Sequence, residues 1–117
     1  MGFTNAGEDK TTDLWDGTVA VPANWYVGSG TGAVAFAKGD TALGTEVESR
    51  VITTDSQPTT DTNRHVGEVT YTATRTITEA GIFDAASVGN MPMREVFAGI
   101  GVTSGDRIEF TFDLTTA

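Results

Sequence analysis

The sequence has no cysteine, and this absence excludes whole classes of site. Without cysteine the chain can form neither a disulfide framework nor a thiolate-bound zinc or iron–sulfur centre. Lysine is scarce as well, since Lys10 and Lys38 are the only two in the sequence. With 16 acidic residues against 7 lysines and arginines, the formal net charge is −9. Such a chain repels nucleic acid, so no nucleic-acid partner is expected.

Long apolar runs are missing too. No segment approaches the length of a membrane span, so no membrane partner is expected. Residues 1–10 contain neither the basic region nor the apolar region of a secretory signal, which predicts a soluble protein made in the cytoplasm. A length of 117 residues with 38% apolar residues predicts a single domain, 1–117, whose core has little margin without neighbouring subunits.

The acidic composition has two interpretations. An excess of acid, few lysines and many threonines are typical of proteins from high-salt organisms, where screening suppresses the self-repulsion of such a chain. An ordinary acidic surface kept soluble by its charge has the same composition. The sequence leaves both open.

The pattern of residues predicts one helix followed by strands. Thr4 is placed to cap a short helix with Glu8 and Asp9 in its first turn, and Asp16-Gly17 to end it. Apolar and polar residues alternate over the longest stretch at 66–78, which is a strong strand signal, and residues 107–114 also alternate cleanly, with Ile108, Phe110, Phe112 and Leu114 inward. Strands are expected at residues 18–21, 25–27, 47–54, 66–78, 91–98 and 107–114, and loops at 28–32 and 55–63. This arrangement predicts a mainly β fold, an antiparallel, jelly-roll-like β-sandwich with a short N-terminal helix.

Residues 77–85, Ile-Thr-Glu-Ala-Gly-Ile-Phe-Asp-Ala, predict a sharp corner between two strands. Glycine takes positive φ without steric cost, so the central glycine would turn the chain and return the following apolar residues to the core. The two acids would hold the corner, and the arginine on the apolar face of the preceding strand would pair with one of them or mark an interface. The residues of this structural corner are Arg75, Glu79, Gly81, Phe83 and Asp84.

Three patterns that could carry chemistry were weighed. Residues 28–33 satisfy a G-x-G-x-x-A dinucleotide fingerprint, but Gly39-Asp40 interrupts the stretch where that site requires a helix, and the chain is too short for a doubly wound sheet. A tight turn or a subunit contact is therefore the better interpretation. His65, the only histidine, would have to serve any Ser-His-Asp triad, and it is interpreted instead as an ordinary exposed residue. Three acids, Asp9, Asp13 and Asp16, lack the alternate spacing of a calcium loop.

Paired carboxylates of a glycosidase are the other candidate chemistry. Nothing in the sequence places two of the acids around a cleft, and solvation, pairing with Arg50, Arg75 or Arg94, or capping are stronger interpretations. The acids in question are Glu46, Glu48, Glu79 and Asp84. The sequence therefore predicts no enzyme, no cofactor and no metal site.

Three aromatic residues are candidates for an interface. Trp15, Trp25 and Tyr26 could stack on sugars, but large rings dominate burial in small domains, so packing in the core or against another subunit is favoured.

The order of several short motifs resembles a small structural protein family of tailed viruses. The motifs are residues 1–7, 26–32, 40–43 and 78–85, Gly89 with Met91, and Arg94 with Phe97. The chain departs from that pattern at Glu8-Asp9-Lys10, where a basic residue is common, and in its low lysine content; both departures fit a virus of a salt-loving host such as a haloarchaeon.

The resemblance implies a non-enzymatic virion protein, either head-decorating or tail-associated. We expect a capsid decoration or turret-base protein, a symmetric homo-oligomer bound to the major capsid protein or another virion protein. One alternative is a tail-tip or fibre-attachment component that contacts a host receptor. Another is a free-standing carbohydrate-binding module.

Overall fold

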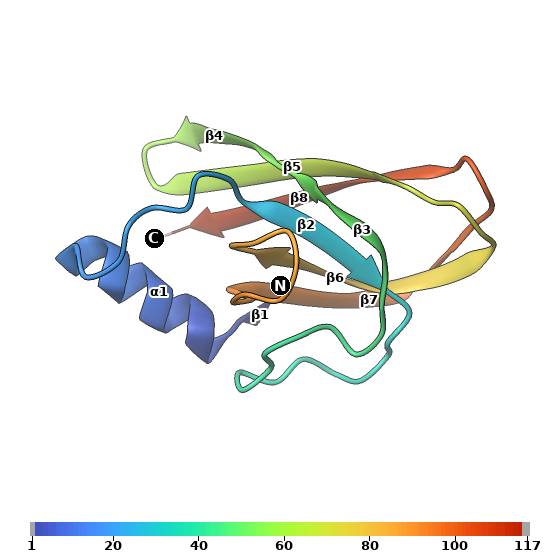
Figure 1. Cartoon of the computed structure of the whole chain (residues 1–117), viewed down its shortest axis with the longest axis horizontal. Coiled ribbons are helices and arrows are strands. Elements are labelled where there is room, and N and C mark those ends of the chain that lie inside the picture. The colour runs from blue at the N-terminus through green and yellow to red at the C-terminus, as the bar shows by residue number, and fades with distance from the viewer. Residues whose placement is uncertain (1, 116–117) are drawn as a thin grey trace.

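A computed structural model describes residues 2–115 (Figure 1). Along the chain it places one helix and eight strands within this range. They are β1 (Gly2–Phe3), α1 (Asn5–Asp16), β2 (Tyr26–Gly30), β3 (Glu46–Ile52), β4 (Thr54–Thr59), β5 (Thr62–Thr70), β6 (Arg75–Phe83), β7 (Met93–Val102) and β8 (Arg107–Thr115).

The strands form two antiparallel sheets that pack face to face. The larger has the order β1-β7-β6-β2-β3 and the smaller the order β4-β5-β8. The chain passes from one sheet to the other between β3 and β4, at Thr53, whose N–H donates to the carbonyl of Trp25. Apolar residues from both sheets share one core, among them Val27, Ile77 and Phe112. The predicted mainly β, antiparallel sandwich with a short N-terminal helix is confirmed.

Helix α1 begins and ends where its capping residues predict. The Thr4 hydroxyl accepts a hydrogen bond from the N–H of Gly7, and Gly17, at φ 75°, closes the last turn with its N–H on the carbonyls of Asp13 and Leu14. The helix lies beside one end of the sandwich (Figure 1). The predicted helix bounds are confirmed.

The predicted strand 66–78 is wrong. The chain leaves β5 at Thr70, turns, and enters β6 of the other sheet at Arg75. At the turn Tyr71 donates its N–H to the carbonyl of Asp106 and accepts from the N–H of Gly105. Apolar residues on either side of this turn continue the same period of two, because both strands face the same core, so alternation alone concealed the break.

The predicted corner at Gly81 is also wrong. Gly81 lies inside β6, paired with Gly28 of β2 and Arg94 of β7. The described glycines with positive φ are Gly17, Gly89 and Gly105. A β-carbon at Gly81 would meet the Met91 sulfur at 3.0 Å and the Met93 carbonyl oxygen at 3.1 Å. Gly81 is therefore needed for close packing rather than for a turn, and the chain turns only after Phe83, through residues 84–92.

Three more local predictions are corrected. The polar segment 55–63, predicted to be a loop, forms most of the β4–β5 hairpin, and Gly28 to Gly30, predicted to begin a loop, belong to β2. Residues 18–21 form no strand. Every residue of β4 is exposed, so the strand has no alternation of apolar and polar residues. It is held by backbone hydrogen bonds to β5 instead.

Candidate functional site

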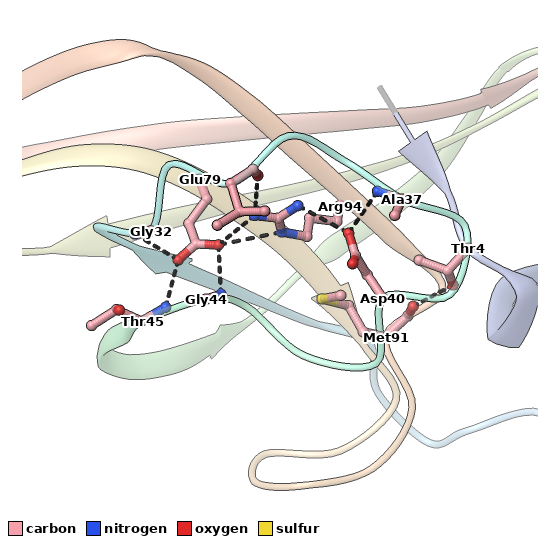
Figure 2. A network of polar contacts seen from close by, with 10 residues as sticks. Thr4, Gly32, Ala37, Asp40, Gly44, Thr45, Glu79, Met91 and Arg94 are labelled. Atoms are coloured by element: carbon pink, nitrogen blue, oxygen red, sulfur yellow. Dashed lines mark hydrogen bonds and ion pairs between the residues drawn. The ribbon is translucent and has the colours of Figure 1, made fainter.

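The side chain of Glu79 lies in the middle of β6, is fully buried and makes many hydrogen bonds. Its carboxylate accepts three backbone hydrogen bonds from the long β2–β3 connection, residues 31–45. The N–H of Gly32 lies 2.9 Å from Oε2, that of Thr45 2.8 Å from Oε2, and that of Gly44 2.8 Å from Oε1. Figure 2 shows these donors converging on the carboxylate from both ends of the connection.

Arg94 of β7 also donates hydrogen bonds to the Glu79 carboxylate. Its Nε and Nη2 atoms lie 3.3 and 3.1 Å from Glu79 Oε1. Its Nη1 donates to Asp40 Oδ2 at 2.9 Å, and its Nη2 to the carbonyl of Val34 at 2.9 Å. Asp40 in turn accepts the N–H of Ala37. We call Glu79, Arg94, Asp40 and the backbone groups that they bind the Glu79–Arg94 network; it joins β6 and β7 to both ends and the middle of the β2–β3 connection (Figure 2).

Glycines make room for this network. A β-carbon at Gly32 would lie 2.5 Å from Glu79 Oε2, and one at Gly30 would lie 2.5 Å from the same atom and 2.3 Å from the Thr45 carbonyl oxygen. Only glycine lets the backbone approach the carboxylate so closely. The G-x-G-x-x-A segment therefore lies against an anion, and that anion is the chain's own Glu79.

Hydrogen bonds keep Glu79 ionised in spite of its burial. Burial by itself raises the pKa of a carboxyl group, since it disfavours the charged form. The N–H groups of Thr45, Gly44 and Gly32, followed by Arg94, outweigh that effect and lower the pKa of Glu79 below its ordinary value. The carboxylate is fixed as an anion with its oxygens occupied, so it is poorly suited to exchange a proton with a substrate.

A second acid, Asp84, fastens the turn after β6. Its Oδ1 accepts the N–H of Asn90 at 2.8 Å, and its Oδ2 lies 3.2 Å from the Nζ of Lys10 on α1. Burial would raise the pKa of Asp84, but the bonds from Asn90 and Lys10 lower it. Thr4 ties α1 to the same turn by donating its hydroxyl to the Met91 carbonyl at 2.6 Å.

Phe83 is buried in the smaller apolar cluster with Leu43 and Met91, and the guanidinium of Arg50 lies 3.4 Å from the centre of its ring. Arg50 also donates to the carbonyls of Ala85 and Val88, so it fastens the turn to β3 as Lys10 fastens it to α1. Arg50 thus makes a cation–π contact with Phe83 and two hydrogen bonds to backbone carbonyls of the turn.

Arg75 does not join the other predicted corner residues. The predicted pair with Glu79 or Asp84 is wrong, because the Nε of Arg75 lies 3.3 Å from Glu48 Oε2. Glu48 sits at φ 62° in a register shift between β2 and β3, which brings its carboxylate to the N–H of Thr72. This bond, opposed by desolvation and aided by the Thr72 hydroxyl and Arg75, lowers the pKa of Glu48.

The three candidate interface aromatics lie in different surroundings. Trp25 packs against the main core and tilts towards His65, with 5.7 Å between ring centres. Tyr26 packs on the smaller cluster around Phe83. Trp15 is 91% exposed and offers a large apolar surface to any partner. They do not form a shared sugar platform, and their interface role stays a prediction.

His65 corrects a further prediction. It is buried, not exposed, with its Nδ1 2.6 Å from Asp55 Oδ1. The described residues contain no group of three or more His, Cys, Asp or Glu side chains suited to a metal ion. No helix within residues 2–115 is long and apolar enough to cross a membrane.

Arg94 and Asp40 are the network members whose roles sequence reasoning missed. Arg94 was one of three candidate partners for the acids, and nothing in its neighbourhood distinguished it from Arg50 or Arg75. The available signal was the combination of a glycine-rich segment with a glutamate on an apolar strand, which indicates an anion held by backbone N–H groups.

Comparison with known proteins gives a match over nearly the whole chain. The model of a family described as Podophage GP4 fiber I protein gp80 matches residues 2–116. No curated protein matches the sequence.

Proposed function

The chain belongs to the family described as Podophage GP4 fiber I protein gp80, and from this membership we propose that it is a non-enzymatic component of the fibre of a tailed-virus particle. The family supports a structural protein of the virion. The observation that carries the proposal is the extent of the match, from residue 2 to residue 116, which includes every described strand.

The geometry of the Glu79–Arg94 network supports a structural role. Its carboxylate and guanidinium groups form hydrogen bonds with one another and with backbone groups, at distances of 2.8 to 3.3 Å. These bonds fix a 15-residue connection, residues 31–45, onto two strands. A catalytic site needs groups that are free to meet a substrate, whereas a particle component needs loops that hold their shape.

Among the roles expected from the sequence, we favour the tail-fibre alternative over head decoration, because the family description names a fibre. A turret base or a decoration site on the major capsid protein is the competing location. Receptor contact is a further step, which the 91% exposed Trp15 supports as a candidate contact residue. A high-salt host is proposed from the acidic composition alone.

The test is fractionation of virus particles. Complete virions, heads made without tails, and isolated fibres are probed with an antibody against this chain, with an antibody against the major capsid protein as the control for heads. We expect the chain in virions and fibres and not in tailless heads. Its presence on tailless heads in amounts comparable to virions would overturn the fibre proposal in favour of head decoration.

A further inference from the structure

The smaller sheet ends in an unprotected edge. In the order β4-β5-β8, strand β8 is outermost, and its nine residues pair with β5 without a register shift. No strand among residues 2–115 pairs with its other side. An outer strand that is long and regular, with neither proline nor bulge, readily accepts another strand. The other edges are less regular. β4 has a register shift and Pro58, β3 has a register shift opposite β2, and β7 has a register shift opposite β6 and is capped at one end by β1.

The sandwich is open along the same side. The larger sheet has five strands and the smaller one three. A cavity of about 210 Å³ lies between β8 and the β6–β7 pair, lined by Ala80, Phe97, Phe110 and Phe112 among others. The rings of Phe97 and Phe110 are in contact there, with 6.2 Å between centres, and Phe97 remains half-buried. A strand added to β8 would cover this cavity.

The charges of β8 suit a second copy of the same strand. When two copies of a strand pair antiparallel around a twofold axis, the axis lies at one residue, which faces its own copy. An axis between two residues would place an outward side chain opposite an inward one. An axis through Glu109 sets that acid against its own copy, and an axis through Thr111 sets Glu109 against Asp113. An axis through Phe110 instead sets Arg107 against Asp113 twice, so that opposite charges meet.

The remaining pairs of the Phe110-centred register agree with it. Ile108 meets Phe112 on the inner face, and Glu109 meets Thr111 on the outer face. Axes through neighbouring positions are poorer: an axis through Ile108 pairs only three residues of β8, and one through Phe112 brings no opposite charges together.

We propose that β8 pairs antiparallel with β8 of a second copy of this chain, with Phe110 on the twofold axis. The charge pattern of the strand selects this register, and the aromatic cavity, which β8 lines from Phe110 to Phe112, supports the addition of a strand at this part of the edge. In the dimer the smaller sheets of the two copies form one continuous sheet, and the Phe97 and Phe110 rings of both copies gather at the axis. The inference concerns the purified chain and holds wherever the chain is located in the particle.

Charge exchange tests the pairing by sedimentation over a concentration series. Arg107→Glu sets two acids opposite each other twice, and Asp113→Lys does the same with two bases. We expect each variant alone to raise the dimer dissociation constant by about tenfold or more. Mixed together, the two variants restore attraction, because the introduced glutamate faces the introduced lysine while the native Arg107 and Asp113 face each other. Lys38→Glu makes the same charge change as Arg107→Glu at a site away from β8 and should leave the constant near its native value.

Cysteine pairs test the register independently of the ion pairs, because the chain has no cysteine of its own. Glu109→Cys and Thr111→Cys both lie at exposed positions of β8. In the Phe110-centred register, a mixture of the two variants should form a disulfide-linked dimer, and each variant alone should not. A native chain that sediments as a monomer throughout would overturn the proposal, as would cross-linking of one variant alone or an equal effect of Lys38→Glu.

Discussion

Glu79 and Arg94 place two opposite charges in the interior, at 0% and 2% exposure. Removing such groups from water costs several kcal/mol for each ion, and their mutual attraction offsets that cost only when the remaining hydrogen-bonding positions are filled. This condition is met for both ions. Three N–H groups fill the remaining positions of the carboxylate, and Asp40 and a carbonyl oxygen bind the remaining N–H groups of the guanidinium. The network therefore holds loop and sheet in one arrangement as long as every member is present.

Replacing Glu79 by glutamine tests this dependence. Glu79→Gln keeps the shape but puts an NH2 group where only hydrogen-bond donors point, and it leaves Arg94 partly unneutralised. We expect a loss of about 3–5 kcal/mol in the free energy of unfolding, measured in urea at neutral pH. Glu68→Gln is the matched control, because the Glu68 side chain is half exposed and its 3.4 Å contact with Arg107 is a surface pair. A loss for Glu79→Gln as small as that of the control would contradict a structural role for the network.

Part of this site was predictable from the sequence. Glu79 and Asp84 were predicted to have holding roles. The segment 28–33 was predicted to form a tight turn or a subunit contact, and its approach to the Glu79 carboxylate was not foreseen. The partners were not predictable, because Glu79 meets Arg94 fifteen positions away and Gly32 forty-seven positions away. Local patterns report only neighbours a few residues apart, so Arg75 was assigned to the nearest acids when its partner is Glu48 on another strand.

Among the elements, those with a strong local signal were predicted and those without one were not. β8 alternates from end to end and α1 carries its own caps, so both bounds lie within a residue or two of prediction. β4 has no buried residue and offers no periodic signal. β5 and β6 share a period across their turn, which made two strands of different sheets look like one.

The link between α1 and the sandwich gives a prediction for Thr4. Its hydroxyl caps the helix and also donates to the Met91 carbonyl, and the residue is fully buried. Thr4→Ala should lower the free energy of unfolding by about 1–2 kcal/mol and speed hydrogen exchange in the first turn of α1, where the N–H of Gly7 loses its acceptor. Thr4→Ser keeps the hydroxyl and should retain most of the stability. Equal losses in the two variants would show that the methyl group, rather than the hydroxyl, is important.

For the whole molecule, two electrostatic effects act in opposite directions as the pH falls. The net charge of −9 makes the folded chain repel itself, and protonation of surface carboxyls relieves that repulsion. Glu79 and Asp84 act the other way. Because folding lowers the pKa of each, they contribute stability above their ordinary values of 4.5 and 3.8, and that contribution is lost as the pH falls below those values.

Salt separates the two effects. At about 1 M salt the Debye length is about 3 Å, so repulsion between exposed acids is screened while the buried Glu79–Arg94 contact is affected much less. At low salt we expect the melting temperature to rise as the pH is lowered from neutral and then to fall below about pH 4.5. At high salt the rise should flatten and the acid-side fall should remain, and Glu79→Gln should reduce that fall. Melting followed by circular dichroism at both salt concentrations measures this. If high salt abolished the acid-side fall, the loss would come from exposed acids, and the buried network would not govern the acid stability of the fold.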